Sequence, residues 1–516
     1  MKKLSKLLLV AVLALGMGLT ACNNEEVPDQ EQSLGGNTWA SISIAFPKSG
    51  TNTRALPDDY NDNGVWKGRD KINRVDVYLV NANSGTIDKT SFNTSAFDVD
   101  INGVLQPNLA IKATAGQQIK AYVVVNDVAD PGKVRPVLDA ATPLNFAYVF
   151  EGAVDAIASE VATADATEDV ILMTNAVAPV AVSLEPGVSE ADAKNPAVDK
   201  NLIKINVERV VSRAIVTQSS TLASTIGVKD NGGSGTVKST LNIVKIEYAV
   251  GQSNKKFNIL KDGVNWTTPD PVYSFVPSTT TPWNGGIANF DYAGLTSYAS
   301  LQPIASSSNT DVITALEAEK TASKFVLPVT HADANYRKGN TTYFEIRVTF
   351  VPEEVDGNPY TYGAGDQVYL GAITGLFYST RALAQAAGET VITQYENNGT
   401  DGFFTKYVTW LNPDKIPGVI ETPVNEYATK SPTVRNQVYH VHVTGFKGIG
   451  VPNNPLNPGP DPLNPGDPDD PKDPENPKNP IDPNDPLENE DTYMSVQITV
   501  LDYTVHSYDI ELGIDY

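Results

Sequence analysis

Two short motifs near the N-terminus hold residues at which the chain can be lipidated or cut. Three lysines precede an apolar stretch, residues 7–18, that is too short to span a bilayer as a stable helix. It leads into Leu19-Thr20-Ala21-Cys22, a bacterial lipobox, in which small residues before the cysteine fit a signal-peptidase pocket. The thiol of Cys22 is therefore expected to take a diacylglyceryl group and to become the new N-terminus. The second motif is Arg54 before Ala55, a lone basic site at which a protease can cut.

The remaining residues with catalytic or metal-binding chemistry form no strong constellation. Cys22 is the only cysteine, which excludes an intramolecular disulfide and a cysteine-based metal site. His440 and His442 share one face of a predicted strand, but no third ligand is nearby in sequence, which favours a structural or solvent-facing pair. The chain has no Gly-x-Ser-x-Gly, His-Glu-x-x-His or Walker A motif. We therefore expect a protein that is not an enzyme and that carries no cofactor.

One acidic loop matches part of a calcium-binding pattern. Positions 1, 3, 5, 6 and 12 of such a loop correspond to Asp59, Asn61, Asn63, Gly64 and Asp70, with Asp in place of the usual bidentate Glu. The flanking helices of that motif are missing from the pattern. An Asx-rich turn is the favoured interpretation, and a calcium site is the alternative.

Two segments at opposite ends of the chain share one apolar/polar alternation, which is typical of β-strands with one buried face. The first is 39–46, and the second is 493–500. The inward positions of the first are Ala40, Ile42, Ile44 and Phe46, and those of the second are Met494, Val496, Ile498 and Val500. The first segment is followed by the site at Arg54, and the second lies beyond a proline-rich tether. A strand that can be cut away and a similar strand at the end of a long tether suggest strand exchange between subunits.

The tether, residues 451–491, has prolines at every third position through most of its length, a period that favours polyproline II. Between Asp461 and Asp491 there are 11 acidic residues and 2 lysines. Self-repulsion should extend this segment, which at about 3.1 Å per residue reaches on the order of 100 Å. We interpret it as a spacer, and a ligand for a protein that binds proline motifs is the alternative.

Composition and periodicity predict an all-β protein. Strands are expected at 74–80, 118–126, 170–174, 202–216, 237–250, 342–351 and 438–446. Helical periodicity is confined to 311–320 and 381–387. Arg209 and Arg213 interrupt the strongest strand, and because buried arginines need carboxylate partners, we expect them near an edge or a domain seam. The net charge of −23 argues against nucleic acid and anionic membrane surfaces as partners.

In this arrangement the chain resembles the Bacteroidales fimbrillins, most closely the major structural subunits of the long and short fimbriae. The resemblance is carried by the lipobox, by 41–44 with Arg54, by 207–216, by 336–344 and by 494–503. It implies two tandem transthyretin-like β-sandwich domains and export as a lipoprotein. It further implies removal of the first strand by an arginine-specific protease and polymerisation by donor-strand exchange. The long acidic tether departs from the family's usual pattern, which leaves a shaft or an accessory subunit open.

These inferences predict a domain plan and a set of partners. We expect a signal peptide over 1–22, a propeptide with the removable strand over 23–54, β-sandwiches over 55–220 and 221–450, the tether over 451–491 and the donor segment over 492–516. The expected partners are further copies of the chain, accessory fimbrial subunits, the protease, and the outer membrane through the lipid of the precursor. The expected role is that of a structural subunit of surface fimbriae that supports adhesion.

The competing hypothesis is a surface glycan-binding lipoprotein. It shares the lipobox and the β-sandwiches, and Trp66, Trp266, Trp283 and Trp410 are its candidate sugar platforms. Such a binding module has no use for the arginine site or for a tethered strand, and these two features distinguish the hypotheses.

Overall fold

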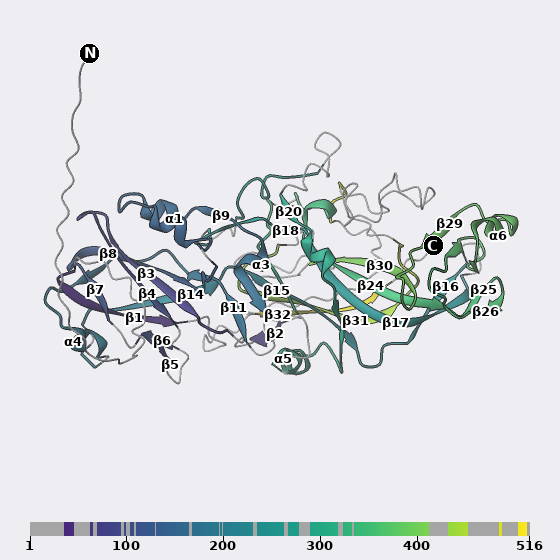
Figure 1. Ribbon diagram of the computed structural model, residues 1–516, viewed down its shortest axis with the longest axis horizontal. Coiled ribbons are helices and arrows are strands. Elements are labelled where there is room, and N and C mark those ends of the chain that lie inside the picture. Colours follow the sequence, from purple (N-terminus) through teal and green to yellow (C-terminus); the bar gives the residue numbers. More distant parts are fainter. Residues whose placement is uncertain are drawn as a thin grey trace, which may run out of the picture.

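The computed structural model is an elongated molecule in which two groups of β-strands lie end to end (Figure 1). It describes residues 36–45, 62–65, 70–93, 97–99, 104–107, 110–129, 131–164, 168–195, 197–198, 200–230, 235–262, 267–277, 289–317, 323–332, 335–411, 432–452, 484–487 and 504–512. None of the helices in these ranges is long and apolar enough to cross a membrane.

The N-terminal half is built on ten strands that surround one hydrophobic core, to which β3, β8, β1 and β14 all contribute side chains. The strand order is β4 (Thr86–Asn93), β3 (Arg74–Asn81), β8 (Gly116–Val125), β12 (Met173–Asn175), β14 (Leu202–Arg209), β1 (Thr38–Ala45), β6 (Val104–Pro107) and β5 (Phe97–Val99), with β13 (Val182–Leu184) beside β8 and β7 (Ile111–Ala113) beside β1.

Short elements cover this half and link it to the next. Phe146 and Phe150 of one short helix pack against Tyr122 of β8. The helices are α1 (Arg135–Asp139), α2 (Phe146–Phe150), α3 (Ala158–Val161) and α4 (Glu190–Lys194), and the small strands are β9 (Ala153–Asp155), β10 (Ala162–Ala164) and β11 (Asp169–Ile171).

The C-terminal half is a sandwich of two sheets. One sheet has the order β2 (Asp62–Val65), β32 (Thr504–Leu512), β31 (Gln437–Phe446), β15 (Ser212–Ser219) and β22 (Gln302–Ile304), with β23 (Lys324–Val326) also on β15. The other has the order β16 (Thr225–Lys229), β17 (Val237–Gly251), β24 (Tyr343–Pro352) and β30 (Phe403–Trp410), with β21 (Ala299–Ser300) on β17. Alternate residues of both sheets meet in one core, among them Tyr439 and Val441 of β31 and Phe344 and Ile346 of β24.

Further short elements complete this half. The helix α5 (Asn309–Glu317) packs on the outer face of β15 and β31, where Val312 and Leu316 contact Ile215 and Val438. The others are β18 (Ser253–Asn254), β19 (Lys256–Asn258), β20 (Phe290–Asp291), β25 (Glu354–Val355), β26 (Asn358–Pro359), β27 (Val368–Gly371), β28 (Phe377–Tyr378), β29 (Ile392–Tyr395), α6 (Arg381–Ala386) and the 3-10 helices η3 (Ala293–Thr296) and η4 (Lys338–Asn340).

The all-β prediction is confirmed, and both helices expected from periodicity are present as α5 and α6. The boundary near residue 220 needs correction. The segment 202–216 is not one strand, because the chain leaves β14 at Arg209, passes through the buried Val210 and Val211, and begins β15 in the C-terminal sheet. Alternation is a local signal and does not tell which sheet a strand joins. The Ser/Gly-rich region instead connects β15 with β16 and β17.

Two buried arginines flank this crossing and confirm the expectation of a domain seam. The guanidinium of Arg209 pairs with Asp70, and Arg209 Nη1 donates to Asn436 Oδ1 over 3.0 Å. Arg213 of β15 pairs with Asp169 of β11, so this ion pair joins the two halves of the molecule. Both guanidinium groups thus have the carboxylate partners that burial requires.

Candidate strand-exchange site

The first strand, β1, is paired along both of its edges inside the N-terminal sheet (Figure 1). It runs parallel to β14, with Ser41 opposite Leu202, and antiparallel to β7 and β6, with Thr38 opposite Ala113. Because it is an inner strand, its departure would leave two rows of backbone groups without partners.

Three of the predicted inward residues of β1 lie in the described part of the chain, and they face the N-terminal core. Ala40, Ile42 and Ile44 are at most 1% exposed and belong to the N-terminal core. The expectation of a polar, open second face is wrong, because Ser41 and Ser43 are also buried. The period-two pattern identified the core side of the strand, but it carries no information on the chain segments that pack over the other side.

The start of β1 is held by side-chain hydrogen bonds to a distant segment. Thr38 Oγ1 donates to the Glu185 carbonyl over 2.6 Å and accepts from the Val188 amide over 3.1 Å. Trp39, the next residue, packs against Val188 and two buried alanines. The first two residues of the strand therefore fix where it begins in its groove.

Asn201 completes this anchor, and the sequence analysis did not identify it. Its Nδ2 donates to the Trp39 carbonyl over 2.9 Å and to the Glu185 carbonyl over 3.0 Å, and its own carbonyl accepts from the Ser41 amide. Its φ of 54° lies in the left-handed region, where Asn is more tolerated than most residues. An Asn directly before the β14 pattern is the only signal that the sequence offers, and it is a weak one.

The end of the chain contributes a strand to the C-terminal sheet of the same molecule. β32 runs parallel to β31, with Gln437 opposite Thr504, and β2 pairs antiparallel with β32 on its other side. The segment that follows β1 in sequence therefore reaches the C-terminal sheet through β2, at the strand formed by the tail (Figure 1).

The other predicted processing and exchange residues lie outside the described ranges. They are the lipidation site Cys22, the cleavage site Arg54 with Ala55, Phe46 of the removable strand, and the donor residues Met494, Val496, Ile498 and Val500.

The calcium hypothesis gains no support from the described residues. Asp59 and Asn61 lie outside them, and the described part of the chain holds no group of three or more His, Cys, Asp or Glu residues placed to bind a metal. The carboxylate of Asp70 accepts a hydrogen bond from Arg209 Nε over 3.0 Å. A cation at Asp70 would have to compete with that guanidinium group.

The two histidines of β31 are buried rather than solvent-facing, which leaves the structural interpretation. His440 Nε2 and His442 Nδ1 lie 2.7 Å and 2.9 Å from the same hydroxyl, Thr217 Oγ1 of β15. Burial lowers the pKa of His440 well below its usual value, and the neighbouring His442 lowers it further. A neutral His440 that shares one hydroxyl with His442 fits a packed sheet face.

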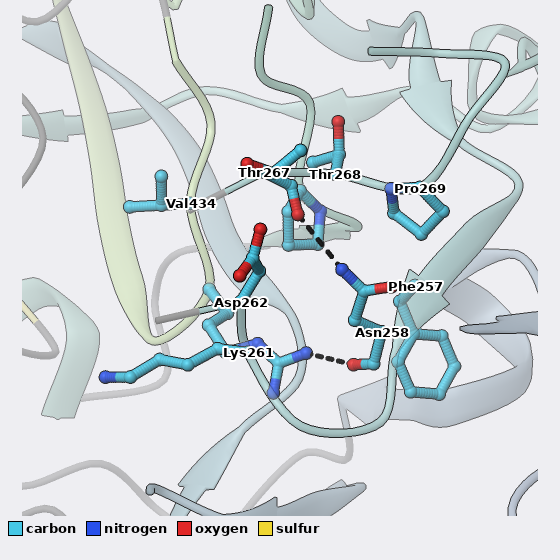
Figure 2. A pocket seen from close by; sticks show the side chains of 10 residues that line it. Phe257, Asn258, Lys261, Asp262, Thr267, Thr268, Pro269 and Val434 are labelled. Carbon is cyan, nitrogen blue, oxygen red and sulfur yellow. Dashed lines mark hydrogen bonds between the residues drawn. The ribbon is translucent and has the colours of Figure 1, made fainter. Parts of the chain in front are cut away.

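The described tryptophan of the glycan hypothesis is not a sugar platform. Trp410 is buried, and its Nε1 donates to the Lys338 carbonyl over 3.0 Å. The pocket in Figure 2, between Phe257, Thr268 and Arg435, measures about 20 Å³, which is room for about one water molecule. A larger pocket of about 350 Å³ around Lys324 is lined mainly by alanine and serine and by no Trp or Tyr.

Comparison with known proteins places the chain among fimbrial subunits. Residues 403–509 match the family described as "Major fimbrial subunit protein type IV, Fimbrillin, C-terminal", a range that includes β30, β31 and most of β32. Two proteins from Porphyromonas gingivalis, both named "Minor fimbrium subunit Mfa1", are 34% and 33% identical to it over 538 and 536 residues. Each alignment covers 99% of this chain and 100% of the relative.

Solved structures similar to this chain include a fimbrilin (FimA) from Porphyromonas gingivalis W83, with a TM-score of 0.39 and 14% identity over 93% of this chain and 99% of that chain. The tip fimbrial protein Mfa3 of the same organism has a TM-score of 0.33 and 11% identity over 78% of this chain and 94% of that chain.

A β-sandwich chain with this full-length similarity is a structural subunit of bacterial surface appendages. It belongs to the fimbrillin family of Bacteroidales, as its resemblance in sequence implies, and its place is in fimbriae at the cell surface.

Proposed function

We propose that the chain is exported as an outer-membrane lipoprotein through Cys22 and cut after Arg54 by an arginine-specific protease. It then polymerises by donor-strand exchange, in which the tail strand of one subunit replaces β1 of the next. The filament supports adhesion and also joins accessory fimbrial subunits. The position of this subunit within filaments would decide whether it builds the shaft or an accessory part.

The observation that carries the proposal is that, in the sequence, Arg54 comes between a strand of one sheet and a strand of the other. The chain leaves β1 in the N-terminal sheet at Ala45 and next enters β2 in the C-terminal sheet at Asp62. A cut after Arg54 therefore breaks the covalent connection between β1 and every other described strand. Only non-covalent contacts then hold β1 in the sheet. The rest of the N-terminal sheet keeps its own connections.

The vacant groove left by β1 would be costly, and this cost favours refilling it. Ile42 and Ile44 each contribute roughly 1.5–3 kcal/mol by burial, and each backbone group left buried without a partner costs about 1–3 kcal/mol. A donor strand with the same alternation restores both the packing and the backbone pairing. We therefore expect exchange rather than a stable open groove.

The anchor at the start of β1 supports a specific register for the donor. When Met494 takes the place of Ala40, Thr492 falls on Thr38 and Tyr493 on Trp39. A threonine hydroxyl would again be available to the Glu185 carbonyl, and an aromatic ring would again lie beside Val188. The donor would thus repeat the anchor of the strand that it replaces, with Val496 and Ile498 in the core.

The pairing of β32 with β31 is, in this proposal, the state of the tail before assembly. A tail held at its end by β31 cannot lay residues 493–500 along a neighbour's groove. β32 therefore has to leave its own sheet when the subunit donates its strand.

The test is N-terminal sequencing of filaments sheared from cells, combined with Arg54→Ala. We expect wild-type filaments to begin at Ala55, and the variant to keep β1 and remain monomeric. Arg69→Ala is the matched control and should assemble normally. Filaments of Arg54→Ala, or a mature N-terminus elsewhere, would contradict the proposal.

A second variant tests the export step. Cys22→Ala removes the only thiol, so the precursor should stay unprocessed by the lipoprotein peptidase and should not reach the surface. Surface labelling of intact cells measures this, and normal display of the variant would refute the lipoprotein step.

A further inference from the structure

One short piece of the acidic tether binds back to the C-terminal half. Lys338 donates its backbone N–H to the Asp485 carbonyl over 2.9 Å, and its Nζ donates to Asp485 Oδ2 over 3.0 Å. Arg337 and Pro486 form an antiparallel bridge, and the half-buried Leu487 packs against an apolar cluster that contains Trp410. Each residue of Asp485-Pro486-Leu487 thus has its own contact.

The binding loop is held rigidly by the sheet beneath it. The Lys338 carbonyl accepts hydrogen bonds from Trp410 Nε1 and from Gln252 Nε2, each 3.0 Å long. Asn340 Oδ1 accepts from the Arg337 amide over 2.7 Å, and Asn340 Nδ2 donates to the Phe275 carbonyl over 3.0 Å. The backbone N–H of Lys338 that contacts the Asp485 carbonyl is therefore held in place by bonds that do not involve the tether.

These contacts select for a specific tripeptide. The ammonium group of Lys338 favours an acidic first residue, and the apolar cluster favours a branched aliphatic third residue. The tether contains the same tripeptide once more, as Asp461-Pro462-Leu463. Asn454-Pro455-Leu456 lacks the carboxylate, and the Asp467-Pro468-Asp469 segment lacks the apolar residue.

We propose that the loop at Lys338 is a recognition site for Asp-Pro-Leu segments and that Asp461-Pro462-Leu463 of the same chain exchanges on it with Asp485-Pro486-Leu487. The tether then has two anchored registers. With the second tripeptide bound, residues 488–503 connect the site to β32, and with the first bound, residues 464–503 do so. At about 3.1 Å per residue the difference in reach is on the order of 75 Å.

The consequence for assembly rests on the proposed strand exchange, but the binding site does not. A subunit anchored at its second tripeptide holds its tail close to its own C-terminal sheet. The same subunit anchored at its first tripeptide can present the tail strand to a distant neighbour once β32 has left its own sheet. The site would thereby set how far the donor segment extends.

Disulfide trapping in the purified full chain tests the exchange, in a Cys22→Ser background that removes the native thiol. Antiparallel bridge partners lie about 4.5–5.5 Å apart at Cα, within disulfide range. Arg337→Cys with Pro486→Cys should therefore cross-link. Arg337→Cys with Pro462→Cys should cross-link weakly, and the yield should rise several-fold when Asp485→Ala and Leu487→Ala weaken the competing segment.

Pro468→Cys is the matched control, because it occupies a proline of the same tether without a following leucine. Its cross-link to Arg337→Cys should not respond to Asp485→Ala and Leu487→Ala. Lys338→Ala should lower the yields of both specific pairs. Tryptophan fluorescence of each variant confirms folding of the region around Trp410.

Equal yields for the cysteines at 462 and 468, or no cross-link at 462 after the competing segment is weakened, would overturn the proposal. Cross-linked dimers in place of monomers would assign the tripeptide to a second copy and would also overturn it. Because the assay needs no filament, a failure of strand exchange does not affect its result.

Discussion

At the scale of single residues, His331 is a buried base that makes stability depend on pH. Burial lowers its pKa to about 4, against the opposing effect of its hydrogen bond to the Asn340 carbonyl, 2.7 Å from Nε2. The folded state therefore binds fewer protons than the unfolded state between about pH 6.5 and pH 4. Stability from this group is fully present above pH 6.5 and is lost as the pH falls through that window.

We expect the free energy of unfolding to fall by about 1 kcal/mol from this histidine alone between pH 7 and pH 5.5. His440 adds to the fall in the same direction. Urea unfolding at several pH values measures it, above the range where carboxylates titrate. His331→Gln should show a shallower pH dependence than the wild type, and an unchanged dependence would contradict the assignment.

A second residue-scale prediction concerns the donor register. Thr492→Val removes the hydroxyl that would take the place of Thr38 Oγ1, which donates to the Glu185 carbonyl in the unprocessed chain. Polymerisation by the processed subunit should become slower, because the donor would leave Glu185 and Asn201 without this partner. Thr499→Val, at the far end of the donor, is the control and should have a smaller effect. Equal rates for both variants would reject the register.

At the scale of elements, the proposed exchange replaces one alternating strand with another, so the inward face of the donor should control assembly. Val496→Asp or Ile498→Asp would place a charge in the core position that Ile42 or Ile44 occupies, which costs several kcal/mol. Ser495→Asp lies on the opposite face and should be milder, although a smaller loss should be measurable there too because Ser41 and Ser43 are buried.

Truncation near Glu490 tests the tail as a whole. The truncation also removes β32 from its place beside β31, but the described core residues of both halves precede the tether. The shortened subunit should therefore fold and stay soluble, but it should not polymerise. Gel analysis without boiling measures this, since assembled fimbriae should give SDS-resistant ladders. Such ladders from the truncated protein would show that another surface drives assembly.

At the scale of the whole molecule, the seam between the halves depends on buried ion pairs. Asp169→Asn removes the negative charge that faces the buried guanidinium of Arg213 across the seam, and we expect a destabilisation of about 3–5 kcal/mol. Glu190→Gln, which breaks the exposed pair with Lys194 on α4, is the control and should cost less than about 1 kcal/mol. Denaturant unfolding compares the two variants. Similar decreases in the free energy of unfolding would show that the seam pair contributes no more to stability than an exposed pair.

The sequence by itself determined the features that depend on neighbouring residues in the chain. The alternation around Ile42 and Ile44 predicted a strand and its core-facing side, and helical periodicity predicted the short helices α5 and α6. The paired character of Arg209 and Arg213 also followed from their residue type, because a buried guanidinium needs a carboxylate.

Only the tertiary structure decided which distant segments meet. It placed β15 in the C-terminal sheet, covered the second face of β1, and brought Asn201 to the start of that strand. It also placed β32 beside β31 and Asp485 beside Lys338. The physical reason is that strand pairing uses backbone groups common to every residue, so the choice of partner depends on the packing of whole sheets and leaves little trace in the local pattern.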